Sequence, residues 1–159
     1  MPICYIGLGA NLNNPRTQIQ TAVEFLQHLP STQLLAVSSY YGSKPLGPQD
    51  QPDYQNAVAE ITTELTPTEL LDALQAQEQQ QGRIKLRHWG ERCIDLDILL
   101  YGDLVLESER LTLPHKELKK RSFVVMPLQE IAPQLILPDG TSIMAIKPEF
   151  GGELIKLNS

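Results

Sequence analysis

The chain has 159 residues, 42% hydrophobic and 20% charged, which fits one compact domain over residues 1–159 with a sizeable core. Its formal net charge of −6 argues against a general affinity for nucleic acid or anionic membranes. The N-terminus lacks the pattern of a signal peptide, and no apolar run approaches the roughly 20 residues that span a bilayer. We therefore expect a cytoplasmic protein with neither a nucleic-acid nor a membrane partner. Cys4 and Cys93 have no metal-ligand spacing and are interpreted as reduced packing residues.

The first half of the chain predicts three strands and one helix. Cys4–Leu8 is a short apolar run, and Asn14-Pro15 then supplies an N-cap and a first-turn proline for a helix. Leu34–Tyr41 and Asn56–Leu65 have the composition or the alternation of strands. Between them, residues 43–53 contain three prolines and one glycine, so we expect an exposed loop that can move.

The second half begins with a helix whose start is well marked. Thr66-Pro67-Thr68-Glu69 is a capping box with proline at the first helical position, and the helix should end by Gly82. Cys93–Tyr101 predicts a strand that ends at the Gly102-Asp103 turn. Leu104–Leu106 is the expected partner of this strand.

Further along, Phe123–Ile131 predicts a partly helical segment with Pro127 near a helix start, followed by a turn at Asp139-Gly140. The resulting order, β-α-β-β-α-β, is that of a ferredoxin-like α+β sandwich. We expect a largely antiparallel sheet with additional C-terminal elements.

Two acidic residues alternate along the predicted strand at 93–101. Because side chains alternate across a strand, Asp95 and Asp97 should project from one face while Ile94, Leu96 and Ile98 face the core. Magnesium favours one or two carboxylates together with water and phosphate oxygens. The pattern indicates a magnesium site, although a solvated acidic strand face explains the spacing alone equally well.

Positive charge is concentrated just before these acids. Nine of the thirteen Lys and Arg residues lie between Arg83 and Arg121, in a chain that is acidic overall. Arg83, Lys85, Arg87 and Arg92 stand against Glu91 alone in residues 83–92. Cations beside acids in one short stretch favour a site for metal and phosphate, with surface ion pairs as the plainer alternative.

The common nucleotide-binding motifs are absent. The chain has no G-x-x-x-x-G-K-[ST] loop, and Gly7-Leu8-Gly9 lacks the third glycine of a dinucleotide fingerprint because position 12 is Leu. Gly7 and Gly9 are interpreted as packing or turn residues. His115 follows Pro114 in a predicted turn and precedes several cations, where it could donate to a phosphate.

Several of these segments together resemble the 6-hydroxymethyl-7,8-dihydropterin pyrophosphokinase family. The most specific match is HWGERCIDLDIL at 88–99, and PLGPQDQPDYQN at 45–56 is similarly close. Shorter matches are GANL at 9–12, RLTLPH at 110–115 and PLQEIAP at 127–133. The resemblance implies transfer of the β,γ-diphosphate of ATP to the pterin hydroxymethyl group, giving AMP and the pterin diphosphate in folate biosynthesis.

The resemblance also implies the cofactors and the site residues. Two Mg²⁺ ions would be held by Asp95 and Asp97, and the enzyme would work as a monomer on small-molecule substrates. Arg83 and Arg92 match catalytic arginines of a mobile loop. Implied nucleotide contacts are Gln75, Glu78, Ile98, Arg110, Thr112, His115 and Arg121. Implied pterin contacts are Ser43, Leu46, Tyr54, Asn56 and Phe123, with the ring stacked between Tyr54 and Phe123.

Two other functions remain open on the residues alone. A two-metal phosphohydrolase would use the same acids and arginines with water as nucleophile. A non-catalytic ferredoxin-like module that binds a small anion would need no metal, and the acids would be surface residues. The pattern also leaves open which of Lys85 and Arg87 meets phosphate, and it assigns residues 141–159 a structural role only.

Overall fold

The central feature of the computed structural model is a sheet whose strands run antiparallel to their neighbours. Residues 1–11, 14–43, 54–82, 94–147 and 155–157 are described. Its elements are β1 (Ile3–Ala10), α1 (Pro15–His28), β2 (Thr32–Val37), β3 (Tyr41–Ser43), β4 (Tyr54–Thr63), α2 (Pro67–Gln80), β5 (Asp95–Tyr101), β6 (Leu106–Glu107), β7 (Thr112–Leu113), α3 (Ser122–Ile131) and β8 (Ile155–Lys156), with 3₁₀ turns at Leu118–Lys120 and Ile143–Ala145.

The strand order identifies the topology. The order is β5-β1-β4-β3-β8, and β2 pairs with β4 beside β3. The order β5-β1-β4-β2 is the arrangement that two split β-α-β units produce, so the predicted ferredoxin-like α+β fold is confirmed. The C-terminal strand β8 extends the sheet beyond β3, which confirms additional elements at this end.

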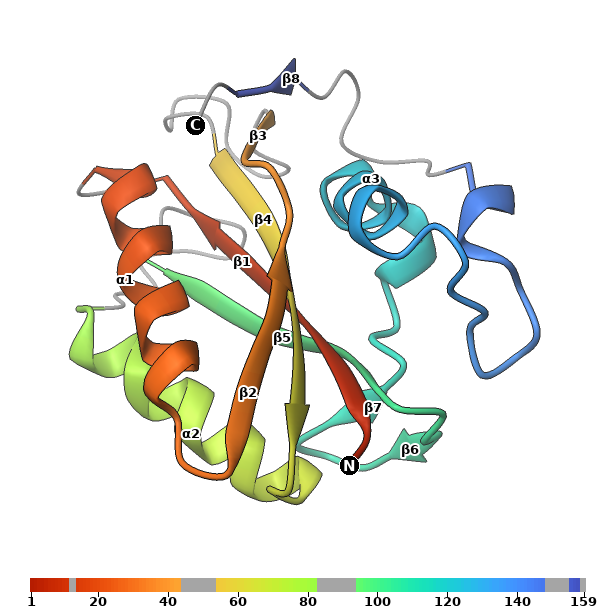
Figure 1. Cartoon of the computed structure of the whole chain (residues 1–159), viewed down its shortest axis with the longest axis horizontal. Coiled ribbons are helices and arrows are strands. Elements are labelled where there is room, and N and C mark those ends of the chain that lie inside the picture. Colours follow the sequence, from red (N-terminus) through yellow and green to blue (C-terminus); the bar gives the residue numbers. More distant parts are fainter. Residues whose placement is uncertain (12–13, 44–53, 83–93, 148–154, 158–159) are drawn as a thin grey trace.

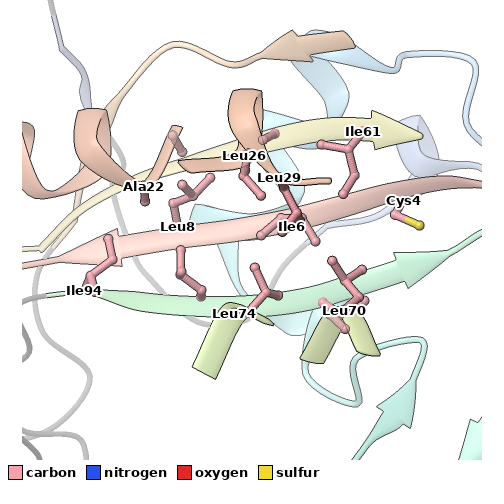
Figure 2. Close-up of a cluster of buried hydrophobic side chains, with 14 of the residues drawn as sticks. Cys4, Ile6, Leu8, Ala22, Leu26, Leu29, Ile61, Leu70, Leu74 and Ile94 are labelled. Atoms are coloured by element: carbon pink, nitrogen blue, oxygen red, sulfur yellow. The ribbon is translucent and has the colours of Figure 1, made fainter. Parts of the chain in front are cut away.

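One face of the sheet packs against α1 and α2 (Figures 1 and 2). Fully buried Ile6, Ile61, Leu26 and Leu74 come from β1, β4 and the two helices and meet in this core. Cys4 is buried there too, and burial raises the pKa of its thiol to about 12, as expected for an inert packing residue. Cys93 lies outside the described residues.

The other face is covered in part by α3 and the segment that follows it (Figure 1). Val58 of β4 and Leu99 of β5 pack here with Leu128 of α3 and Ile143 of the second 3₁₀ turn. At the last turn of α3, Glu130 accepts hydrogen bonds from the Tyr41 hydroxyl at 2.6 Å and from the Ser39 backbone N–H at 3.0 Å. These contacts fix the last turn of α3 against the sheet.

Local sequence explains where the helices start. The Thr66 hydroxyl accepts from the Glu69 N–H at 3.1 Å and Glu69 accepts from the Thr66 N–H at 2.9 Å, so the predicted capping box is confirmed. Asn14 is the N-cap of α1 but has left-handed backbone angles and makes no side-chain cap bond. Proline at the first helical position marks that start instead.

Three expectations about local structure were wrong. The segment 34–41 is not one strand, because Ser38 and Ser39 separate β2 from β3. The Ser38 hydroxyl accepts a hydrogen bond from the Val58 N–H, and the Ser39 N–H donates one to Glu130. β6 pairs with β7 rather than with β5, whose inner edge is taken by β1. Pro127 lies inside α3 and not at a helix start.

The turn expectations held. Gly102 and Gly140 both have positive φ, the conformation that these turns require and that glycine adopts most easily. In the described part of the chain, no helix has the length and apolar character needed to cross a membrane.

Candidate active site

The candidate site lies on the α3 side of the sheet, at the carboxyl end of β1. Gly9 of β1 is paired with Asn56 of β4 on one side and with Asp95 of β5 on the other. Residues directly opposite one another in an antiparallel sheet share a face. Asn56, Gly9 and Asp95 therefore form a row across three strands, with a glycine in the middle.

Asp97 belongs to the next row along the same face. It is paired with Gly7, which is in turn paired with Val58. Asp95 and Asp97 are partly exposed, whereas Ile94, Leu96 and Ile98 are buried, so the predicted division of the two faces is confirmed. Both facing positions of β1 are glycines, so β1 contributes no side chain beside the carboxylates.

The chemistry of this donor set fits Mg²⁺, which takes hard oxygen ligands and keeps several waters or phosphate oxygens. Two carboxylates on one strand face supply the protein share of such a shell. Within the described ranges no three His, Cys, Asp or Glu side chains are grouped to hold a metal ion, so an all-protein cage is not built there. A site that is completed by substrate phosphates needs none.

His115 is held against the outer edge of β5. Its backbone N–H donates to the Leu99 carbonyl at 2.9 Å, and its Nδ1 accepts from the Glu117 N–H at 3.1 Å. Burial and the Arg121 charge lower the pKa of His115, with Lys116 acting in the same direction. Asp95 and Glu117 oppose this effect on the pKa. The ring is therefore neutral near pH 7, and because Nδ1 accepts a bond, Nε2 carries the proton.

The same pKa couplings show that His115 lies within electrostatic reach of Asp95. Arg121 extends the group toward α3: its guanidinium carbon is 5.5 Å from the centroid of the Phe123 ring. Its Nε is 3.6 Å from a Glu117 carboxylate oxygen, and its side chain is only 13% exposed. The structure thus brings His115, Arg121 and Phe123 together at the start of α3.

The residues that resemble nucleotide contacts gather at the β5 edge and along α2. The Arg110 guanidinium donates to Gln75 at 3.0 Å and to Asp72 at 2.7 Å, which joins the segment before β7 to α2. Glu78 is 5% exposed and accepts from the Leu96 N–H at 2.7 Å.

Two further expected nucleotide contacts lie near this group. Thr112 begins β7 and is partly exposed. The Ile98 side chain is 2% exposed and belongs to the helix-side core, so only its backbone is available to a ligand.

The expected pterin contacts are only partly described. Tyr54 and Asn56 lie two residues apart on one face of β4, Asn56 is 4% exposed, and Phe123 stands in the first turn of α3. The backbone of Ser43 ends β3 and pairs with Tyr54. The expected site residues Leu46, Arg83 and Arg92 lie outside the described residues, as do Lys85, Arg87 and the loop over 44–53.

Sequence reasoning missed Gly9 as a member of the site. A Cβ at this position would lie 2.9 Å from Asn56 Oδ1, closer than real Cβ contacts allow. The available signal was a glycine inside a strand pattern, which marks a close approach of another group. The strand register that reveals its neighbours comes from pairing between distant segments.

The comparisons with known proteins cover nearly all of the chain. The family model of 7,8-dihydro-6-hydroxymethylpterin-pyrophosphokinase matches residues 5–133. The chain is 53% identical over 159 residues to the 2-amino-4-hydroxy-6-hydroxymethyldihydropteridine pyrophosphokinase of Haemophilus influenzae, covering 99% of both proteins. It is 52% identical over 136 residues to the protein of the same name from Pseudomonas aeruginosa, covering 86% of this chain and 84% of that protein.

Solved structures agree on the fold. A wild-type HPPK-DHPS from Plasmodium falciparum, crystallised with SDX-DHP, matches with a TM-score of 0.67 at 13% identity. The match covers 91% of this chain and 42% of that longer chain, so this chain spans less than half of it. A likeness at this identity speaks for the fold alone. The family match and the two high-identity relatives carry the assignment: the chain belongs to the 7,8-dihydro-6-hydroxymethylpterin-pyrophosphokinase family.

Proposed function

We propose that this chain transfers pyrophosphate from ATP to the hydroxymethyl group of 6-hydroxymethyl-7,8-dihydropterin, giving AMP and the pterin diphosphate in folate biosynthesis. The observation that carries the proposal is the row of Asn56, Gly9 and Asp95 across three strands. It sets the buried Asn56 amide across β1 from Asp95, on the face that Asp97 shares, within a chain of this family. The unit of activity is the single domain over residues 1–159.

Asp95 and Asp97 would hold the metal, for which we propose two Mg²⁺ ions. When bound, Mg²⁺ would neutralise charge on the phosphates and orient them. The two side chains contribute oxygens from one face of a strand whose backbone is fixed by pairing with β1. The residues opposite them on β1 are Gly9 and Gly7, so β1 itself places no side chain beside the carboxylates.

His115 and Arg121 would bind the phosphates of ATP. A neutral His115 offers the Nε2–H as a hydrogen-bond donor without competing for a proton at neutral pH. Arg121 adds a permanent positive charge that is largely withdrawn from solvent, where its attraction for phosphate is strong. Family resemblance adds Arg83 and Arg92 as catalytic arginines that act on the transferred group.

The rest of the nucleotide would lie along the outer edge of β5. Gln75, Glu78, Arg110 and Thr112 are the proposed side-chain contacts, and Ile98 contributes its backbone N–H and carbonyl because its side chain is buried. β5 is the outermost strand of the described sheet at this end, so its outer backbone groups face away from β1.

The pterin ring would stack between Tyr54 and Phe123, with Asn56 hydrogen-bonding the ring edge and Ser43 and Leu46 lining the pocket. A flat heteroaromatic ring suits two aromatic walls, and a nearly buried amide supplies both donors and acceptors. We further propose a cytoplasmic monomer that acts only on small molecules, without nucleic-acid or membrane partners.

The direct test measures AMP in mixtures of the protein, ATP and MgCl₂, with and without hydroxymethyl-dihydropterin. We expect AMP only when pterin is present and Mg²⁺ is not chelated. Release of inorganic phosphate from ATP without pterin would instead favour a phosphohydrolase. An activity that is indifferent to chelation would contradict the proposed metal.

A further inference from the structure

Gly9 stands midway between the two parts of the proposed site. On β4 its partner is Asn56, which is proposed to hydrogen-bond the edge of the pterin ring. On β5 its partner is Asp95, a proposed metal ligand. Neighbouring strands lie about 4.8 Å apart, so the backbones of Asn56 and Asp95 are separated by about 10 Å. A substrate that is recognised at one strand and reacts at the other must cross β1.

The space above Gly9 is asymmetric. A Cβ built there would have Asn56 Oδ1 at 2.9 Å, the Gln55 carbonyl oxygen at 3.9 Å and Asn56 Cγ at 4.0 Å as its nearest neighbours. All three atoms belong to β4, and no described atom of β5 comes closer. Among the described residues, the close contacts above Gly9 therefore lie on the Asn56 side and not on the side of Asp95.

We propose that Gly9 is a specificity-determining residue. Because it has no side chain, the hydroxymethyl arm of the pterin can extend across its backbone from Asn56 to the carboxylates. The inference rests on the proposed function and names the part of the site that admits its acceptor substrate. A methyl group at position 9 would displace the Asn56 amide and occupy the path of the arm. ATP, which approaches along β5, would be unaffected.

Gly7 provides a matched control on the same strand and face. It is paired with Val58 and Asp97, one row further from the pterin side. A Cβ at Gly7 would meet only the Leu99 side chain as its three nearest atoms, at 3.4 to 3.6 Å, which is ordinary van der Waals contact. An alanine at position 7 should therefore be accommodated.

The experiment compares Gly9→Ala with Gly7→Ala in the full chain, measuring the KM for hydroxymethyl-dihydropterin, the dissociation constant of an ATP analogue and the thermal midpoint. Because the added methyl would lie too close to Asn56 Oδ1 and in the path of the arm, Gly9→Ala should raise the pterin KM about tenfold or more and change nucleotide binding by less than about twofold. Gly7→Ala should leave both constants near wild type. An unchanged pterin KM in Gly9→Ala, or the same increase in Gly7→Ala, would overturn the proposal.

A second comparison separates obstruction of the ligand from displacement of the amide, and it holds even if Gly9→Ala alone folds poorly. Asn56→Ala removes the atom that the new methyl would strike. The double variant Gly9→Ala/Asn56→Ala should bind pterin more weakly than Asn56→Ala alone, because the methyl still stands in the path. Equal affinity of the two would overturn the proposal. Wild-type protein that forms no AMP with pterin would refute the proposed function itself, whatever these variants do.

Discussion

Asp95 and Asp97 combine two properties that an ordinary acidic strand face lacks. Each lies opposite a glycine of β1, so β1 places no side chain next to the carboxylates. Asp95 also lies within electrostatic reach of His115. Spacing in the sequence predicts a shared face for the acids, and pairing with glycines keeps β1 side chains away from them.

Replacing Asp97 with Asn keeps the shape of the side chain and removes the charge that would hold the metal. We expect Asp97→Asn to lower AMP formation by about 100-fold or more, as losing one electrostatic contact to a transition state often does. Thermal unfolding should be near wild type because the carboxylate is partly exposed. The matched control is Asp103→Asn, an exposed acid in the turn after the same strand. Turnover retained in Asp97→Asn would contradict the metal assignment.

His115 gives the protein a predictable response to acid. Its folded-state pKa lies below the ordinary value of 6.5, chiefly because of burial and the Arg121 charge. The unfolded chain therefore binds more protons, so the stability due to a neutral His115 is full above pH 6.5 and is lost as pH falls through the folded-state pKa.

The variant that checks this is His115→Asn, whose side-chain oxygen can still accept the Glu117 N–H. Between pH 7.5 and pH 5, the thermal midpoint of wild type should fall further than that of His115→Asn. Arg121, Lys116, Glu117 and Asp95 remain in both proteins, so their contributions largely cancel. Equal falls in the two proteins would show that His115 is not held neutral by its surroundings.

At the scale of elements, α3 is the part whose position matters most, because Phe123 is in its first turn. Its last turn is tied to the sheet by Glu130, which accepts bonds from Ser39 and Tyr41. Burial alone would raise the pKa of Glu130, but the bonds from Tyr41 and Ser39 outweigh that effect and lower it. The contacts therefore favour the ionised carboxylate.

Truncating this side chain should loosen α3. We expect Glu130→Ala to destabilise the protein by about 1–3 kcal/mol, since several hydrogen bonds are lost, one of them from a tyrosine hydroxyl to a carboxylate. Chemical denaturation at pH 7 measures this. The difference between wild type and Glu130→Ala should shrink as pH falls below the ordinary value of 4.5 and through the lowered folded-state pKa.

Glu24 offers the comparison for Glu130. It is an exposed acid on α1, and Glu24→Ala should change stability by no more than about 0.5 kcal/mol. If Glu130→Ala were as mild as Glu24→Ala, the bonds to Ser39 and Tyr41 would not hold α3 in place.

For the molecule as a whole, features set by neighbouring residues could be predicted, and features set by distant pairing could not. The capping box at Thr66 and Glu69 is complete within four residues, and its geometry was predicted correctly. The partner of β6 was predicted wrongly, because the choice between β5 and β7 depends on which edges other elements already occupy. His115 and Glu78 bind the outer edge of β5, which local sequence does not reveal.

The candidate site divides in the same way. Alternation along one strand predicted that Asp95 and Asp97 share a face, and family resemblance supplied the substrate and the roles of Tyr54, Asn56 and Phe123. Gly9 joined the site only through its register with two other strands. Glycine has no functional group that would mark it as a site residue in the sequence, so its place in the site can be recognised only from its neighbours in the structure.

We propose above all that the β- and γ-phosphates of ATP are transferred to the pterin as one unit. The fate of the γ-phosphate tests this most directly. With ATP labelled at the γ-phosphate, Mg²⁺ and hydroxymethyl-dihydropterin, we predict that the label appears in the pterin diphosphate as its terminal phosphate. One AMP should form for each labelled product. Label recovered as inorganic phosphate, or as a pterin monophosphate together with ADP, would contradict the account.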